Sequence, residues 1–359
     1  MGVFSSAFLV LLLMLVLPFS GFVNGEKDEL KGCDIYEGRW EYDDSYPLYN
    51  SSQCPFIEMP FDCQNNGRPD QLYLKYRWKP YACDLPRFSG KHLLEKFENK
   101  RIMFVGDSIS LNQWQSLTCM IHSWTPHDAY ILQRDHQGFS TFTFLKHNVS
   151  LILSRNALLV DIAHKSWGRV LKLNTISDNN AKRWKDSDVL VFNSWHWWLH
   201  RGRKQPWDFI RDGDDLHKDM DRLVAYEKAL STWSKWVDKN IDFTKTEVFF
   251  QGISPAHINA KLGGKNGGKS CREDTKPLIG PPHPKRRLSA EVIVEKVISS
   301  MSNKVHLLNI TRLSQQRKDG HPSVYGRPGR HIGMDCSHWC LPGVPDTWNE
   351  LLLAELTRS

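Results

Sequence analysis

A serine at position 108 has the sequence context of a catalytic nucleophile. It follows a short apolar run over 101–106, and the residues after it have helical spacing. A turn from strand to helix places such a serine at the carboxyl edge of a parallel sheet, beside N–H groups at the helix start that have no acceptor in the helix. Those groups can stabilise an oxyanion. We therefore expect Ser108 to attack an acyl group.

Asp335 and His338 are the expected partners of Ser108. They are separated by three positions, so the carboxylate can hold the imidazole without a contact from a distant element. His338 would then act as the general base that accepts the proton of Ser108. The competing interpretation is a local cap at Asp335 and an ordinary surface histidine. His321 is a rival base, and its nearest acid, Asp319, precedes a glycine turn.

Polar and aromatic residues near these motifs are candidates for binding the oxyanion or the substrate. Asn193 ends a predicted strand, and the tryptophans that follow could stack on sugar rings. Packing in the core or in a lid is the alternative for these tryptophans, and His196 is interpreted as structural. The candidates are Gly106, Asp107, Asn112, Asn193, Trp195 and Trp197.

These motifs resemble those of the plant trichome birefringence-like family of cell-wall polysaccharide O-acetyltransferases. The similar stretches occur in the family's order, at 33–88, 106–119, 188–198, 319–326 and 335–349. The resemblance implies that Ser108 is the nucleophile and that Asp335 and His338 complete the triad. It also implies an SGNH/GDSL-hydrolase-like fold and a Golgi membrane location with a lumenal catalytic domain.

Two positions depart from the family's pattern. Leu111 stands where the family usually has arginine, and Trp195 where it commonly has glycine. We expect these changes to alter the charge and space around the acyl group. Three functions therefore stay open: O-acetylation of a wall polysaccharide through an acetyl-serine intermediate, removal of acetyl groups from pectin by an acetylesterase, and non-catalytic binding of pectin.

The cysteines predict an oxidising compartment. All eight follow the apolar amino-terminal segment, and an even number suits a set of disulfides whose pairing the sequence cannot choose. Bonds from Cys336 and Cys340 would fix the loop that carries His338. A zinc site is disfavoured because this pair lacks a second close pair. The disulfide candidates are Cys33, Cys54, Cys63, Cys83, Cys119, Cys271, Cys336 and Cys340.

Residues 1–25 are expected to form a signal peptide or a signal-anchor, because an apolar core there ends at Pro18. Cleavage would send the protein to the cell wall, whereas an uncleaved anchor would keep it in the Golgi membrane. N-glycosylation motifs fit either route. They lie at Asn50, Asn148 and Asn309.

The remaining pattern predicts an α/β fold with a central parallel sheet flanked by helices and a smaller disulfide-rich amino-terminal or minor lobe bordering the cleft. The cysteine-rich region 33–88 packs on a catalytic domain at 89–359. Buried strands are expected at 102–105, 189–193, 248–251 and 305–310, with helical patterns at 220–237 and 344–356. A hairpin at 141–153 is assigned to the smaller lobe. Residues 263–269 and 280–287 are predicted to be mobile surface loops.

The net charge of +7 and the pI of about 8.9 favour a polyanion such as pectin over a neutral hemicellulose such as xylan. We expect a monomer that acts on cell-wall polysaccharide, with no nucleic-acid partner. No glycine-rich phosphate loop or cluster of metal ligands stands out, so no metal and no tightly bound cofactor are expected. The sequence does not identify the acetyl donor.

Overall fold

The computed structural model describes residues 30–177, 181–257, 271, 274–278, 287–328 and 334–358. The predicted signal segment 1–25 lies outside these residues. So do the predicted loops 263–269 and 280–287, apart from Arg287. Across the described ranges, no helix has the length and apolar character needed to cross a membrane.

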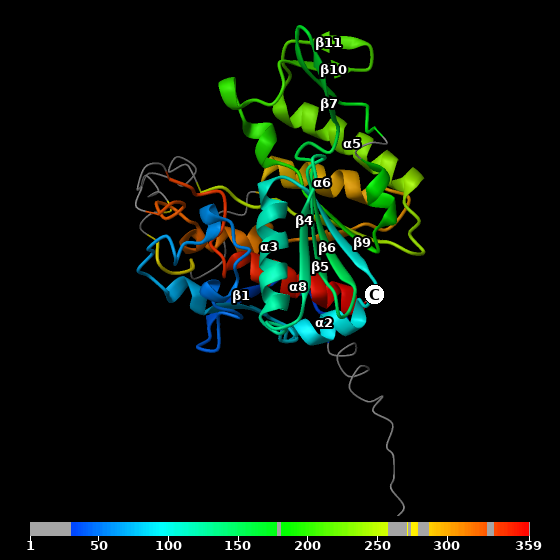
Figure 1. Cartoon of the computed structure of the whole chain (residues 1–359). Helices are drawn as coiled ribbons and strands as arrows, with labels where there is room; N and C mark the ends of the chain where they lie inside the picture. The colour runs from blue at the N-terminus through cyan, green and yellow to red at the C-terminus, as the bar shows by residue number, and fades with distance from the viewer. Residues whose placement is uncertain are drawn as a thin grey trace, which may run out of the picture.

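A seven-stranded sheet has the order β13–β12–β9–β3–β6–β5–β4. Its strands β4, β5, β6 and β9 are labelled near the centre of Figure 1. The strands from β13 to β6 in this order run parallel, and β5 and β4 are antiparallel additions at one edge. The strands are β3 (Arg101–Gly106), β4 (Tyr130–Arg134), β5 (Phe139–Phe144), β6 (Val149–Arg155), β9 (Val189–Phe192), β12 (Glu247–Gln251) and β13 (His306–Leu308).

Helices cover both faces of this sheet because its central strands are apolar on both sides. Ile102 and Phe104 of β3 join one core with the first helix group, whereas Met103 and Val105 join a second core with the other group. The first group is α2 (Gly90–Lys96), α3 (Ser108–His122) and α8 (Val344–Arg358), and the second is α5 (Arg222–Asn240) and α6 (Ser289–Ser299). The predicted α/β fold with a helix-flanked central sheet is confirmed.

The predicted hairpin at 141–153 is present as β5 and β6, but its assignment to a smaller lobe is wrong. β6 pairs in parallel with β3 along the whole of β3, so the hairpin extends the central sheet. Alternation of side chains shows which face of a strand is buried, but it does not show which strand lies next to it. The sequence pattern therefore could not place this hairpin.

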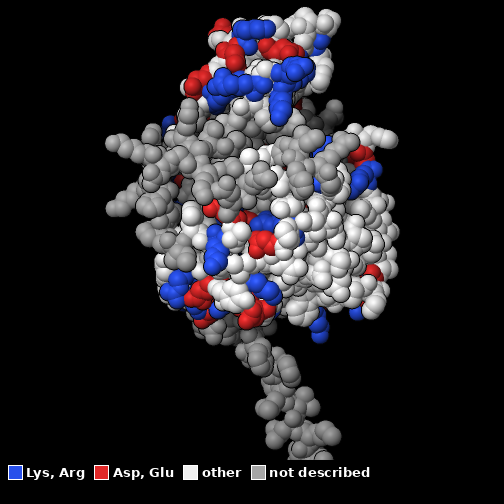
Figure 2. Space-filling model, turned by 90° about the vertical axis from the view of Figure 1, so that its left-hand side faces the viewer, with Lys and Arg blue, Asp and Glu red and all other residues white. Residues whose placement is uncertain are grey.

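A separate four-stranded sheet occupies the upper part of Figure 1, in the order β11–β10–β8–β7. Figure 2 shows Lys, Arg, Asp and Glu side chains gathered on this part of the molecule. Its strands are β7 (Asp161–Lys165), β8 (Gly168–Lys172), β10 (Phe209–Asp212) and β11 (Asp215–His217). These short strands mix polar and apolar residues, so their sequences do not predict this sheet.

The amino-terminal region is covalently tied to the rest of the protein. Strands β1 (Gly38–Tyr42) and β2 (Tyr76–Pro80) pair antiparallel. Two disulfides leave the region, one to α3 and one to the loop before α8. The four pairs are Cys33–Cys83, Cys54–Cys119, Cys63–Cys340 and Cys271–Cys336, which leave no free cysteine.

Short helices connect the larger elements. The helix α7 (Thr311–Gln315) follows β13. The 3-10 turns are η1 (Ser51–Gln53), η2 (Met59–Phe61), η3 (Leu72–Lys75), η4 (Lys182–Asp186), η5 (His196–Leu199), η6 (Gly202–Lys204) and η8 (Lys318–Gly320).

Candidate active site

Ser108 is the first residue of α3 and follows β3 after a single connecting residue. That residue, Asp107, caps the helix because its carboxylate accepts a hydrogen bond of 2.8 Å from the backbone N–H of Ile109. Gly106 permits a close approach of β9, since a Cβ at 106 would lie 2.5 Å from the carbonyl oxygen of Asn193. The Gly-Asp-Ser turn thus places the serine at the carboxyl edge of the sheet.

His338 lies against Ser108, although the two residues are 230 positions apart in the chain. Its Nε2 is 2.7 Å from the Ser108 Oγ, and its Nδ1 is 2.7 Å from Oδ2 of Asp335. A carboxylate accepts hydrogen bonds, so Nδ1 carries the proton and Nε2 is left to accept one from the serine. This is the hydrogen-bonding order of a Ser-His-Asp triad.

The second oxygen of Asp335 holds the turn that carries His338. Oδ1 accepts hydrogen bonds from the backbone N–H groups of Ser337 and His338, at 3.0 and 3.1 Å, and from the Ser337 hydroxyl at 2.9 Å. Partial burial raises the pKa of Asp335, but the hydrogen bond to His338, the histidine's charge and the two backbone donors outweigh it, so the pKa lies well below its usual range. Asp335 therefore stays ionised.

The pKa of His338 moves in the opposite direction. Burial lowers this pKa, but the hydrogen bond to Asp335 and the negative charges of Asp335 and Asp107 outweigh it, so the pKa lies above its usual value. Solvent still reaches the two partners, whose side chains are 24% (His338) and 28% (Asp335) exposed. His338 is thus a base of increased strength at an open site.

Asn112 supports the loop around His338 from within the core. Its side-chain oxygen accepts a hydrogen bond of 2.8 Å from the Trp339 backbone N–H, and its amide donates one of 3.1 Å to the Trp339 carbonyl. The side chain is fully buried. The prediction that Asn112 binds the oxyanion or the substrate is wrong, because the loop uses both of its polar groups.

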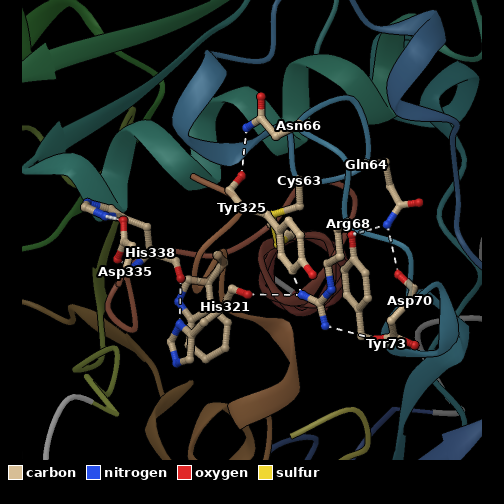
Figure 3. Close-up of a disulfide and its surroundings, with 12 residues drawn as sticks. Cys63, Gln64, Asn66, Arg68, Asp70, Tyr73, His321, Tyr325, Asp335 and His338 are labelled. Carbon is tan, nitrogen blue, oxygen red and sulfur yellow. Dashed lines mark hydrogen bonds and ion pairs between the residues drawn. A yellow bond between two sulfur atoms is a disulfide. The ribbon is translucent and has the colours of Figure 1, made fainter. Parts of the chain in front are cut away.

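His321, the rival base, lies behind the same loop. Its Nδ1 is 2.6 Å from the carbonyl oxygen of His338, and its ring stacks on Trp339 with 4.0 Å between ring centroids. Figure 3 shows His338 and Asp335 together, with His321 on the other side of the His338 backbone. Asp319 pairs with Arg317 and not with His321. His338 is therefore the imidazole that contacts the serine.

Ser108 and His338 line a cleft with a volume of about 720 Å³. Gly106, Asp107 and Trp197 are predicted site residues that also line it, and Trp197 is 37% exposed. Trp195 does not line the cleft, because it packs on Tyr226 with ring centroids 5.0 Å apart. The structure thus places one of the two candidate tryptophans where a substrate could contact it.

Asn193 and His196 have different positions at this edge. Asn193 is 2% exposed and does not line the cleft, yet its side-chain oxygen has no hydrogen-bond partner among the residues that the structure describes. His196 lines the cleft, and its Nε2 is 2.9 Å from the Ser254 carbonyl oxygen. That contact agrees with the structural role expected for His196.

The sequence analysis missed the cleft residues at the end of β6 and at the β4–β5 turn. These include Gln137, Arg155 and Asn156. A signal existed, because polar residues after a strand parallel to β3 must lie at the same edge as Ser108. Because the sequence pattern assigns the hairpin at 141–153 to a separate lobe, it does not place the residues at the end of β6 at the same edge of the sheet as Ser108.

Comparisons with known proteins agree with this geometry. Residues 85–355 match the "GDSL/SGNH-like Acyl-Esterase family found in Pmr5 and Cas1p", and residues 31–84 match the "PMR5 N terminal Domain". Protein trichome birefringence-like 43 of Arabidopsis thaliana is 54% identical over 363 residues, which cover 100% of this chain and 98% of that protein. Protein trichome birefringence-like 41 is 53% identical over 350 residues, covering 97% and 95%. The chain belongs to the trichome birefringence-like family.

Membership of the trichome birefringence-like family supports an enzyme of the acyltransferase or acyl-esterase type. The four disulfides are in keeping with proteins of the secretory pathway. Leu111 is 4% exposed and packs in the core beneath α3. Neither Leu111 nor Trp195 lines the cleft, and the expected effect of these two positions on the charge and space around the acyl group stays a prediction.

Proposed function

We propose that this protein transfers acetyl groups to a cell-wall polysaccharide through an acetyl-serine at position 108. The observation that carries the proposal is the hydrogen-bonded chain from the Ser108 Oγ through His338 to Asp335, with both contacts at 2.7 Å, at the wall of an open cleft. An exposed cleft suits a polymer, which must enter and leave from the side.

In the first half-reaction, the Ser108 oxygen attacks the acetyl carbonyl carbon while its proton moves to Nε2 of His338. The oxyanion forms near the start of α3, where the Ser108 N–H has no acceptor in the helix. The carbonyl then re-forms, and the leaving group departs with the proton from His338. The product is an acetyl ester on Ser108.

In the second half-reaction, a sugar hydroxyl gives its proton to His338 and attacks the carbonyl carbon of the acetyl ester. The carbonyl then re-forms, the bond to the Ser108 oxygen breaks, and His338 returns the proton to that oxygen. Water at the same place would produce acetate, and the protein would then be an acetylesterase. This second candidate is favoured by the match to an acyl-esterase family model. Only the identity of the attacking oxygen separates the two activities.

Cationic groups at the cleft support a carboxylated substrate such as pectin. Arg155 lines the cleft and is half exposed, with only a 3.5 Å contact to Glu58. The segment between the cleft residues His200 and Pro206 adds Arg201, Arg203 and Lys204. These three side chains are exposed, and no carboxylate of the described residues pairs with them. The three unpaired cations of this segment add positive charge beside the open cleft, and positive charge attracts polyanions.

The test uses two polysaccharides and distinguishes three outcomes. The purified protein is incubated with acetylated and deacetylated pectin and xylan, with and without an acetyl donor. New polymer acetyl groups that require Ser108 support the transferase, and released acetate supports the esterase. Retained polymer binding without either product supports the non-catalytic alternative and contradicts an enzymatic role.

The substrate class has a separate test with a matched control. Arg155→Gln should raise KM for pectin about 3- to 10-fold, as expected for the loss of one charge contact, and leave KM for neutral xylan unchanged. Arg39→Gln removes an exposed arginine on β1, outside the cleft residues, and serves as the control. Equal effects of Arg155→Gln on both polymers would contradict the carboxylate assignment.

We further propose that the protein works in the Golgi lumen or in the cell wall. The disulfides support a lumenal route, and Asn50 and Asn148, which are both exposed, would be accessible to glycosylation; Asn309 is half-buried. The amino-terminal sequence of the mature protein tests cleavage of segment 1–25. Removal of that segment would assign the cell wall, and its retention would assign the Golgi membrane.

A further inference from the structure

Two histidines form a hydrogen-bonded chain behind the loop that carries His338. Nδ1 of His321 is 2.6 Å from the His338 carbonyl oxygen, and Nε2 of His321 is 2.6 Å from Nδ1 of His257. Nε2 of His257 is 3.2 Å from the Gln315 carbonyl oxygen. Neither ring lines the cleft, and the reaction described above uses neither.

The acceptors at the two ends of the chain determine where its protons lie. Burial, with a smaller effect of His257, lowers the pKa of His321 well below its usual value, and burial lowers the pKa of His257 to about 4. Both rings are therefore neutral near pH 7, with one proton each. A carbonyl oxygen only accepts, so the 2.6 Å contact to His338 requires the proton of His321 on Nδ1.

That choice fixes the second ring as well. Nε2 of His321 then accepts, so His257 donates from Nδ1, and its own Nε2 faces the more distant Gln315 carbonyl without a proton. A proton on Nε2 of His257 would instead leave two unprotonated nitrogens 2.6 Å apart, whereas a proton on Nδ1 leaves only the longer contact of 3.2 Å to Gln315 without a hydrogen atom. Both hydrogen bonds thus point towards His338.

The surroundings prevent His321 from turning away. Its ring stacks on Trp339, and its carbonyl oxygen accepts a hydrogen bond of 3.0 Å from Arg68 of the amino-terminal region (Figure 3). Arg68 lies over the Tyr73 ring at 3.7 Å and also donates to the Asp319 carbonyl oxygen at 2.7 Å. His321 is held on both sides with its Nδ1 directed at the His338 backbone.

We propose that His321, backed by His257, is a positioning residue for the general base. By donating to the His338 carbonyl oxygen, it fixes the backbone of His338 so that Nε2 meets the Ser108 Oγ. The inference rests on the proposed function, because it takes His338 as the base. His321 acts only through His338, since it does not reach the reacting atoms.

Two amide substitutions at position 321 form a matched test. In His321→Asn, the amide nitrogen can occupy the place of Nδ1 and still donate to the His338 carbonyl oxygen. In His321→Gln, the amide reaches the place of Nε2 and leaves no donor at Nδ1. We expect kcat of the Asn variant to stay within about threefold of wild type. That of the Gln variant should fall about 10- to 100-fold, with KM unchanged.

A second pair of variants, at position 257, keeps the inference testable if substitutions at the buried position 321 cause misfolding. His257→Asn keeps a donor for His321, whereas His257→Leu removes it, so only the Leu variant should lose kcat. The thermal unfolding midpoint of every variant is measured in parallel. The inference is supported if the losses in kcat follow the donor and not the midpoint.

Three results would overturn the inference. One is equal kcat for the Asn and Gln variants at 321 in an active protein, which would leave the proposed function intact. Another is a loss of kcat that follows the unfolding midpoint, which would assign the histidines a purely structural role. The third is a folded wild-type protein that neither turns over acetyl esters nor reacts with a serine-directed probe, since that contradicts the proposed function itself.

Discussion

Asp335 determines which nitrogen of His338 faces Ser108. Its Oδ2 accepts a hydrogen bond from the N–H at Nδ1, and its Oδ1 accepts hydrogen bonds from two backbone N–H groups of the same turn. The carboxylate therefore sets the tautomer of the histidine and the shape of the turn at once. A neutral amide at position 335 can separate these two effects, because it can keep the turn but can also donate to Nδ1.

The first prediction concerns Asp335→Asn. An amide that donates to Nδ1 places the ring proton on Nε2, where it blocks proton transfer from Ser108. We expect kcat for acetyl transfer or hydrolysis to fall about 10³- to 10⁴-fold, as in other triads, with little change in KM. Initial rates on a small acetyl ester measure this effect. Asp242→Asn, at an exposed turn outside the cleft, is the control, and a loss below about tenfold for Asp335→Asn would contradict the assigned role.

The second prediction concerns the dependence of kcat/KM on pH. His338 accepts a proton only when neutral, so activity falls as pH decreases through its pKa. The partnership with Asp335 raises that pKa above the ordinary value of 6.5, despite burial. The acid limb should therefore lie above pH 6.5 and move to lower pH when Asp335 is replaced by asparagine. An acid limb that is unchanged in Asp335→Asn would show that another group titrates.

At the scale of elements, the segment 334–343 before α8 is fixed by covalent and polar contacts from several directions. Cys340, two residues after His338, is bonded to Cys63 of the amino-terminal region. The ring of Phe61, from the same region, lies 5.5 Å from that of His338. The amino-terminal region thus contributes to the geometry of the site, although none of the residues 33–88 lines the cleft.

A third prediction compares two disulfides of that region. The bond Cys63–Cys340 spans 277 residues and ends beside His338, whereas Cys33–Cys83 spans 50 residues within the region. The double variant Cys63→Ser/Cys340→Ser should lose about 2–5 kcal/mol of stability and also lose kcat. Cys33→Ser/Cys83→Ser should lose stability with kcat retained. Unfolding curves and initial rates for both variants test this difference, and equal losses of kcat would contradict it.

A fourth prediction concerns the buried acid Glu350 on α8. Tyr46 donates to its Oε1 at 2.7 Å, and burial raises the pKa of Glu350 to about 7 from the ordinary 4.5. Between pH 4.5 and about 7, Glu350 binds a proton in the folded protein but not in the unfolded chain. The free energy of unfolding therefore decreases as pH rises through this range. Glu350→Gln should therefore raise the free energy of unfolding at pH 8 by about 1–3 kcal/mol.

The same substitution should have little effect near pH 4, where Glu350 is protonated in the folded protein and largely protonated in the unfolded chain. The side-chain carbonyl of the introduced glutamine can still accept the hydrogen bond from Tyr46, so packing is preserved. Denaturant unfolding at both pH values provides the measurement. A stability change of the same size at pH 4 and pH 8 would contradict the assignment of a proton to this group.

At the scale of the whole molecule, the features that sequence predicts well are those with local causes. β3, β9 and β12 are apolar runs buried on both faces, and their predicted bounds agree with the structure to within one residue at each end. Ser108 and His338 could be paired across 230 positions because few residue types perform this chemistry.

The features that sequence does not predict depend on which segments become neighbours. Asn112 sits one helical turn after Ser108, and nothing in its own sequence shows that the Trp339 backbone will occupy its amide. Arg155 reaches the cleft because β6 pairs with β3, and strand order does not appear in side-chain alternation. Leu111 likewise is buried in a core that residues of α3 and α8 share, and its own sequence context does not show which elements form that core.

The most direct test of Ser108 as the nucleophile is the site at which a fluorophosphonate probe modifies the folded protein. We expect a single covalent adduct on Ser108, identified by mass spectrometry of the digested protein. It should be absent in Ser108→Ala and form at least about 10²-fold more slowly in His338→Ala. A protein that turns over acetyl esters while Ser108 stays unmodified, or that is labelled equally in Ser108→Ala, would contradict the account.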